Sequence, residues 1–308
     1  MTFLSKKKEK WLLSRAKLYK GVFVGGSIGK NASADAFYRN AIDKELKNFI
    51  TSLYSDLESV YGVLQVSNAS KPQKASISRV LAILNTYKGA KLRIFLKNAD
   101  KIIHKWLKKA SQSTDESIRK VLFEMSGKEI SINYNRAYDD ILRLIIDRNV
   151  QLITNTTSQT LTNIENIVFD GMTTGGGWGE IEKTLKEQKE ISRNRVRRIA
   201  RDQTAKANEA LSELTQRENG VKFFMWRTMG DERVRERHRP LDGKIYKWGD
   251  VEERLPIIDK LKGKVIHGYP AQAVNCRCIA LPVWILKGYT AEWSDSEKCY
   301  KVEKGGYV

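Results

Sequence analysis

Apolar residues recur at the spacing of an α-helix through the first two thirds of the chain. Between residues 77 and 106 one helical face is mostly apolar, while most of the charged residues lie on the other faces. This face consists of Ile77, Leu81, Leu84, Lys88, Leu92, Phe95, Ile102 and Trp106. The same kind of periodicity predicts further helices over residues 35–61, 115–125, 134–169, 178–190 and 193–219. The pattern therefore predicts a mainly α N-terminal body.

The pattern changes after residue 220. Pro72 is the only proline before that position, whereas Pro240, Pro256, Pro270 and Pro282 follow it. Because proline is tolerated poorly inside helices, this asymmetry predicts a domain boundary close to residue 220.

The last third has the signals of short strands and tight turns. Residues 221–228 are a β-prone run, the Asp242-Gly243 pair is a hairpin signal, and residues 245–248 are a candidate returning strand. A helical turn is expected over 231–239, with Asp231 as its N-cap. These signals predict a small α+β C-terminal module.

Glycine-rich segments predict two further divisions. Residues 20–33 are rich in Gly and Ser and are expected to form a flexible arm after a basic N-terminal helix. The predicted domains are thus 1–33, 34–220 and 221–308, with the middle one as the helical body. The Gly175-Gly176-Gly177 cluster is interpreted as a hinge or helix C-cap, since a phosphate-binding loop requires Lys-Ser/Thr where Trp178 follows.

The charge balance points to a polyanionic partner. The 308 residues include 55 Lys and Arg against 36 Asp and Glu, a formal net charge of +19. The excess is concentrated in residues 1–30 and 71–120, which favours nucleic acid over a merely soluble basic protein. The predicted non-specific DNA-binding residues are Lys91, Lys97, Lys101, Lys105, Lys108 and Lys109. A solvated helix face remains the alternative for these lysines, as it does for the basic run 193–206.

Cysteine usage and hydropathy indicate the compartment. Three cysteines do not make a disulfide framework, and no secretory leader pattern is visible, so folding in a reducing cytoplasm is expected. No apolar stretch approaches the roughly 20 residues needed to span a bilayer, so no membrane partner is expected. A basic, apolar N-terminus around Trp11 lying on a membrane surface is a less favoured alternative.

Cys276, Cys278 and His238 are candidate metal ligands. Two thiolates and one or two imidazoles could form a tetrahedral Zn²⁺ site, so one structural zinc ion is the cofactor considered. The Cys-x-Cys spacing is less typical of zinc sites than Cys-x-x-Cys. The alternative is that both thiols are small packing residues and that His238 is an ion-paired or core histidine.

Asp231, Arg235 and His238 would share one face of a helix, which leaves two interpretations open. The structural one is an Asp231–Arg235 ion pair that braces the module. The catalytic one is a metal-dependent nuclease or hydrolase that uses Asp231 and His238 with Cys276 and Cys278. No catalytic-triad order, paired-carboxylate spacing or His-Glu-x-x-His motif supports an enzyme, so a binding role is expected.

Read in order, several motifs resemble one known family. These motifs are residues 199–204, 226–228, 231–238, 241–243 and 275–278. They are similar to the phage head morphogenesis family, the minor head proteins of the phage Mu protein F type. Besides His238 and the two cysteines, the matching motif positions are Arg201, Thr204, Asn208, Trp226, Asp231, Arg235, Asp242, Gly243, Asn275 and Arg277.

The resemblance implies a minor capsid protein found in the virion, and in the host cytoplasm during assembly. Its implied partners are the portal protein, scaffold or major capsid protein, and double-stranded DNA. A cellular nucleic-acid-binding protein unrelated to virions is a further alternative.

The chain departs from the family pattern in one place. The stretch between Trp248 and Asn275 is longer and more basic than expected, so His267 is not carried over as a functional residue. Some relatives are fused to toxin domains such as ADP-ribosyltransferases, and no such extension is expected here.

Overall fold

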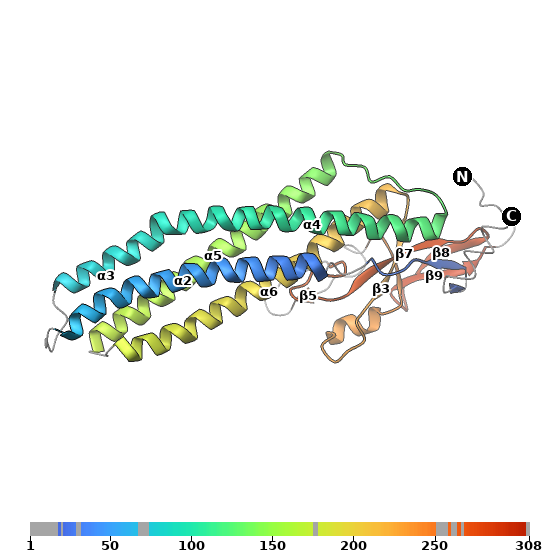
Figure 1. Cartoon of the computed structure of the whole chain (residues 1–308). Coiled ribbons are helices and arrows are strands. Elements are labelled where there is room, and N and C mark those ends of the chain that lie inside the picture. The colour runs from blue at the N-terminus through green and yellow to red at the C-terminus, as the bar shows by residue number, and fades with distance from the viewer. Residues whose placement is uncertain are drawn as a thin grey trace. The chain divides into compact units, whose positions relative to one another are not determined.

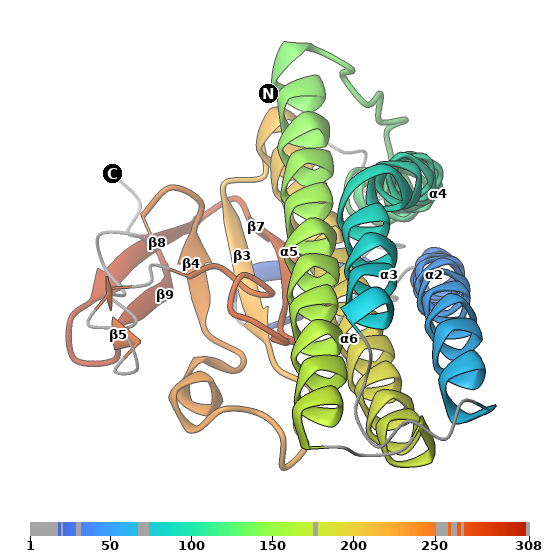
Figure 2. The same ribbon diagram turned by 90° about the vertical axis from the view of Figure 1, so that its left-hand side faces the viewer.

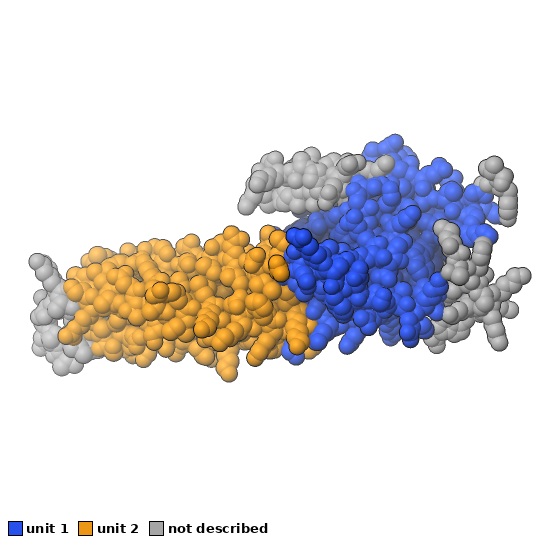
Figure 3. Space-filling view, turned by 90° about the horizontal axis from the view of Figure 1, so that it is seen from above, with its two compact units in different colours: residues 1–31, 109–142, 204–308 blue, residues 32–108, 143–203 orange. Residues whose placement is uncertain are grey.

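The structure is a computed structural model with two compact units, coloured separately in Figure 3. It describes residues 18–19, 21–28, 32–66, 74–174, 178–250, 258–259, 264–265 and 268–305. Unit 1 comprises residues 1–31, 109–142 and 204–308, and unit 2 comprises residues 32–108 and 143–203. Each unit therefore combines separate segments of the chain, whereas the division expected from the sequence is linear.

Long helices dominate the part of the chain before residue 220 (Figure 1). They are α2 (Ala32–Val66), α3 (Lys74–Thr86), α4 (Leu92–Ser126), α5 (Arg136–Thr174) and α6 (Trp178–Glu218). A π-helical segment, Tyr87–Lys91, lies between α3 and α4. The predicted mainly α body is confirmed, but α2 continues through Gly62 and α6 is one helix rather than two. A single glycine costs a helix only about 1 kcal/mol relative to alanine, which 35 residues of α2 tolerate.

The core of unit 2 forms along one face of α2. Figure 2 shows α2, α3, α5 and α6 running alongside one another. The Tyr38 ring stacks on Trp106 with centroids 4.5 Å apart, and its hydroxyl donates a hydrogen bond of 2.9 Å to Asn149 Oδ1. A Cβ at Gly171 would lie 2.4 Å from the side chain of Ile181, so glycine permits close packing of α5 on α6. Gly175-Gly176-Gly177 lies outside the described residues.

A buried carboxylate in unit 2 binds the start of the basic run. Asp43 accepts two hydrogen bonds from Arg193, of 2.9 and 3.0 Å, and one of 2.7 Å from Arg197. Burial alone would raise the pKa of Asp43. The two guanidinium groups have the larger combined effect in the opposite direction, so the pKa lies below its usual value. Arg193 and Arg197 therefore have a structural role, and they do not supply free charge for an external anion.

Unit 1 contains an antiparallel sheet with the strand order β1-β2-β7-β3-β4-β9-β8 (Figure 1). The strands are β1 (Leu18–Tyr19), β2 (Val22–Val24), β3 (Phe223–Arg227), β4 (Ile245–Lys247), β7 (Ile279–Ile285), β8 (Tyr289–Ser294) and β9 (Cys299–Lys304). A separate two-stranded sheet is formed by β5 (Ile258–Asp259) and β6 (Lys264–Val265). The predicted α+β character of the C-terminal module is confirmed.

Residues 22–24 lie in this sheet, although a flexible arm is expected there from the sequence. Val22 pairs with Ile285 of β7, and the Gly25 N–H donates to the carbonyl oxygen of Pro282 at 2.8 Å. A Cβ at Gly25 would lie 2.5 Å from the Met125 sulfur and 2.8 Å from the Pro282 ring. The glycine at position 25 thus reflects close packing and not only flexibility.

The sheet also packs against helical segments of its own unit. One core cluster joins residues in and just after β2 with the end of α4, the start of α5 and the end of α6. Its buried members are Phe23, Ile28, Ile118, Val121, Leu122, Met125, Ile132, Tyr138, Leu211 and Val221. The C-terminal strands consequently share a hydrophobic core with helices that precede residue 220.

No described helix combines the length and the apolar character that crossing a membrane requires.

Candidate functional site

The connection between β3 and β4 holds the first half of the site. Met225 of β3 pairs with Ile245 of β4, as predicted for strands on either side of the Asp242-Gly243 turn. Gly243 has a φ of 75°, and its N–H donates to the Trp226 carbonyl at 2.8 Å. Asp242 Oδ1 accepts the Thr228 N–H at 2.7 Å, which secures the end of β3.

The helical element in this connection is the 3₁₀-helix η2 (Glu236–Leu241), not a turn over 231–239. Arg235 has the extended angles φ −60° and ψ 140°, so Asp231 and Arg235 do not share a helical face. The predicted Asp231–Arg235 ion pair is wrong. In the described structure the Arg277 guanidinium donates to the Asp231 carboxylate at 2.5 and 2.7 Å, and Arg235 donates to the Val274 carbonyl at 2.6 Å.

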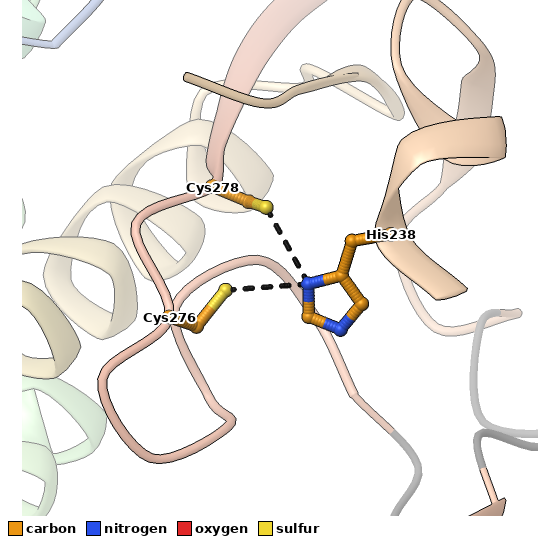
Figure 4. Close-up of side chains that lie close together, drawn as sticks. All are labelled: His238, Cys276 and Cys278. Atoms are coloured by element: carbon orange, nitrogen blue, oxygen red, sulfur yellow. Dashed lines mark hydrogen bonds between the residues drawn. The ribbon is translucent and has the colours of Figure 1, made fainter. Parts of the chain in front are cut away.

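The segment that leads into β7 holds the second half of the site. Asn275 has a φ of 57°, a left-handed conformation that asparagine tolerates better than most residues. The Cys276 N–H donates to the Ala273 carbonyl at 2.9 Å, which closes the turn. Cys276 and Cys278 lie two residues apart just before β7, and both side chains are directed toward His238 (Figure 4).

His238 and the two cysteines converge (Figure 4). Nδ1 of His238 lies 3.6 Å from the Cys276 sulfur and 3.5 Å from the Cys278 sulfur. The three side chains are buried, and their candidate ligand atoms lie within 4.8 Å of one another. Asp231, also considered for a catalytic centre, is not in this group, since its carboxylate is bound by Arg277. His267 lies outside the described residues.

The two thiols affect each other's protonation. Hydrogen bonding with Cys278, and then with His238, lowers the pKa of the Cys276 thiol in spite of its burial. The pKa of Cys278 is raised, chiefly by the hydrogen bond with Cys276 and by burial. Cys276 is therefore the thiol that loses its proton first.

Apolar side chains surround the cluster. Trp226 is fully buried, and its ring meets that of His238 edge to face with centroids 5.5 Å apart. The same core contains Phe224, Leu241, Tyr246, Trp248, Tyr269, Ala280 and Cys299. Side-chain contacts thus hold η2 and the Cys-x-Cys segment against one hydrophobic core. They are the contacts of Asp231, Arg235, His238, Asp242 and Arg277.

The motif positions on α6 do not take part in the contacts around the His-Cys-Cys cluster described above. Arg201 is exposed, Thr204 is buried, and Asn208 accepts a hydrogen bond of 3.1 Å from the Thr114 hydroxyl of α4. Glu209, the next residue, was not identified from the sequence. Its buried carboxyl accepts the Ala280 N–H at 3.2 Å and so connects α6 to β7. An acidic residue inside a polar helix gives no sequence signal of such a role.

Replacing Glu209 with Gln should stabilise the protein at neutral pH. Burial raises the pKa of Glu209 well above its usual value, and the Ala280 N–H offsets only part of this effect. A carboxyl whose pKa is higher in the folded state contributes stability below its unfolded pKa and loses that contribution as the pH rises through the folded pKa. The gain from Gln should therefore increase with pH, since the wild type loses about 1.4 kcal/mol of stability for each pH unit between the unfolded and the folded pKa of Glu209.

Urea unfolding from acidic to neutral pH measures this effect. Glu187→Gln, an exposed substitution on the same helix, is the matched control and should leave the free energy of unfolding nearly unchanged. A Glu209→Gln variant that is less stable than the wild type at neutral pH would contradict the prediction.

The predicted DNA-binding lysines are all exposed. Lys97, Lys101, Lys105 and Lys108 of α4 follow helical spacing, so they form one stripe about 17 Å long at 1.5 Å per residue. Lys91 lies in the π-helical segment, with its ammonium 5.9 Å from the centre of the Tyr87 ring. Between residues 97 and 109 the sequence has one acidic residue, Asp100. The stripe therefore has a strong local positive charge.

A comparison with known proteins finds a family match over the segment that contains the motifs. Residues 162–281 match the family described as Phage Mu protein F like protein. An uncharacterized protein of Haemophilus influenzae is 26% identical over 247 residues, which cover 78% of this chain and 52% of that protein. An NAD(+)–arginine ADP-ribosyltransferase EFV of Enterococcus faecalis is 29% identical over 126 residues, which cover 39% of this chain and 25% of that protein. No solved structure matches the chain significantly.

The chain spans about half the length of the first relative and a quarter of the second. The family match begins within α5 and ends within β7, so it includes α6, η2 and the Cys-x-Cys segment. The resemblance drawn from the ordered motifs is confirmed by this match. Residues 162–281 of the chain are thus similar to the proteins of the Phage Mu protein F like family.

Proposed function

We propose that the chain is a minor component of the phage head that binds the portal protein and double-stranded DNA. The family match over residues 162–281 is the observation that carries this proposal, because it associates the chain with phage heads. In this proposal the chain is present in the virion, and in the host cytoplasm during assembly. Scaffold and major capsid protein are the other candidate partners.

The proposed role is binding rather than catalysis. The carboxylate of Asp231 is occupied by Arg277, and the cluster of His238 with the two cysteines is buried in an aromatic core. A nuclease or hydrolase would need a nucleophile and a proton acceptor that reach the substrate. These contacts favour a structural role for the motif.

DNA contact is proposed for the lysine stripe of α4. Lysine ammonium groups attract phosphates without base specificity, which suits a protein that meets a packaged genome of any sequence. The stripe is favoured over the basic run of α6, since Arg193 and Arg197 of that run are bound to Asp43. Arg195, Arg198 and Arg201 remain exposed there as the alternative anion contact.

Portal binding is proposed for the helical unit 2, and paired surface variants of the full chain test it. Leu144 and Ile191 are exposed apolar residues of unit 2, and Met229 and Val274 are comparable residues of unit 1. The double variant Leu144→Ser, Ile191→Ser should weaken co-sedimentation with purified portal oligomers, whereas Met229→Ser, Val274→Ser should bind as the wild type does.

Two other outcomes of the co-sedimentation experiment would contradict portal binding by unit 2. Loss of portal binding only in the Met229, Val274 variant would assign the contact to unit 1. If the wild type does not co-sediment with portal oligomers at all, but does so with scaffold or major capsid protein, the portal part of the proposal is wrong.

A further inference from the structure

We infer that His238, Cys276 and Cys278 bind one Zn²⁺ ion, which joins η2 to the segment that leads into β7. The inference concerns the chain itself and does not depend on the proposed portal and DNA contacts. In sequence, His238 lies 38 residues before Cys276 and 40 residues before Cys278. The candidate ligand atoms of the three residues nevertheless face one another (Figure 4).

The spacing of the ligand atoms fits such an ion. Bond lengths of about 2.3 Å to sulfur and about 2.0–2.1 Å to nitrogen, at tetrahedral angles, separate a nitrogen from a sulfur ligand by about 3.6 Å. The observed distances from His238 Nδ1 to the two sulfurs are 3.6 and 3.5 Å. An ion at bonding distance from the imidazole can therefore also reach each thiolate.

Hydrogen bonding alone accounts poorly for this convergence. Nδ1 of an imidazole carries either one proton or one lone pair, so it can make one good hydrogen bond. Here two sulfurs approach the same nitrogen at nearly equal distances. A cation between the three atoms would interact favourably with all of them at once.

The donor set selects the kind of metal. Thiolate and imidazole ligands favour Zn²⁺ over Mg²⁺ and Ca²⁺, which prefer oxygen ligands. The described residues supply three ligand atoms to this group, which leaves one position of a tetrahedral ion for a water molecule or another donor. The Asp231–Arg277 pair holds the backbone between the two cysteines and thus helps to fix the ligands.

Zinc binding by the reduced full-length protein tests the inference. The protein is incubated with Zn²⁺, excess metal is removed, and bound zinc is measured by native mass spectrometry and elemental analysis. The wild type should retain one ion per chain, and His238→Ala, Cys276→Ser and Cys278→Ser should lose most of it. Cys299→Ser, which removes the third buried cysteine, and His104→Ala, which removes an exposed histidine, should retain the ion.

Cobalt substitution gives a readout that does not require the variants to fold. Co²⁺ bound to the wild type should show sulfur-to-cobalt charge-transfer absorption and tetrahedral ligand-field bands, and Zn²⁺ should displace it. The inference is overturned if the reduced, folded wild type retains no zinc and gives no such spectrum. It is equally overturned if Cys299→Ser abolishes zinc binding while Cys276→Ser and Cys278→Ser retain it.

Discussion

A fragment of residues 221–308, produced alone, should not fold cooperatively. This fragment keeps β3, β4, β7, β8 and β9 but lacks β2, which pairs with β7 through Val22–Val24. It also lacks Phe23, Ile28 and the residues of α4, α5 and α6 that complete the core beside Val221. Burial of each large apolar side chain contributes about 1.5–3 kcal/mol to stability. The loss of several such side chains is therefore comparable to the whole free energy of unfolding of a domain, about 5–15 kcal/mol.

Thermal unfolding followed by near-ultraviolet circular dichroism measures the fragment against the full chain. The full chain should show a cooperative transition that the fragment lacks. A fragment with the same transition as the full chain would show that residues 221–308 are independent, as the linear domain division implies.

Aggregation of the fragment would also remove its cooperative transition. A pair of glycine variants in the full chain therefore tests the packing of residues 22–28 independently. Gly25→Ala should destabilise by about 1–3 kcal/mol, because the added Cβ overlaps Met125, Pro282 and Val121. Gly26→Ala is the matched control, since its Cβ would meet only Val121, at 3.8 Å. Equal stability of the two variants would contradict the packing of residues 22–28 against the helices.

Reversal of Lys97, Lys101, Lys105 and Lys108 to Glu should largely abolish DNA binding at moderate salt. Each phosphate contact to duplex DNA adds about 0.9 to the slope of log affinity against log salt, so loss of four contacts should reduce that slope by up to about 4. The four side chains are exposed, so the fold should survive the substitutions. Fluorescence anisotropy with a labelled duplex at several salt concentrations measures both effects.

A charge-matched variant controls for net charge. Lys44, Lys47, Lys183 and Lys186 are exposed lysines of α2 and α6, and their reversal changes the formal charge equally. This control should retain most of the affinity. If both variants lose the same affinity, binding depends on net charge; if neither does, α4 is not the DNA contact.

Periodicity predicted the helices well because their apolar faces repeat locally. Their boundaries were less accurate, since α4 and α6 each join two segments that the sequence separates. The sequence shows where a helix-forming pattern weakens, for example at Ser192 and Arg193 of α6. Tertiary contacts such as Arg193 with Asp43 maintain the helix there.

The sheet was predicted only in part because its pairings are distant in sequence. The β3–β4 pair surrounds a local turn signal and could be recognised, whereas Val22 pairs with Ile285 across almost the whole chain. No local pattern identifies such a partner. A run of glycines beside a short apolar segment equally suggests a flexible arm.

The members of the buried His-Cys-Cys cluster could be singled out from the sequence, but the contacts that brace the cluster could not. His238, Cys276 and Cys278 could be singled out because such residues are few in the chain. The partner of Asp231 depends on backbone angles at residues 231–235, which are not helical, so helical spacing indicated Arg235 in place of Arg277. Glu209 lacked any signal because its partner is a backbone N–H.

Cross-linking mass spectrometry of purified phage heads and procapsids assembled in the presence of the chain tests whether it is a head component. We expect the chain to be present in far fewer copies than the major capsid protein, and residues of unit 2 to cross-link to the portal protein. Absence of the chain from purified heads and procapsids, while it is abundant in the infected cell, would contradict the proposed role in the head.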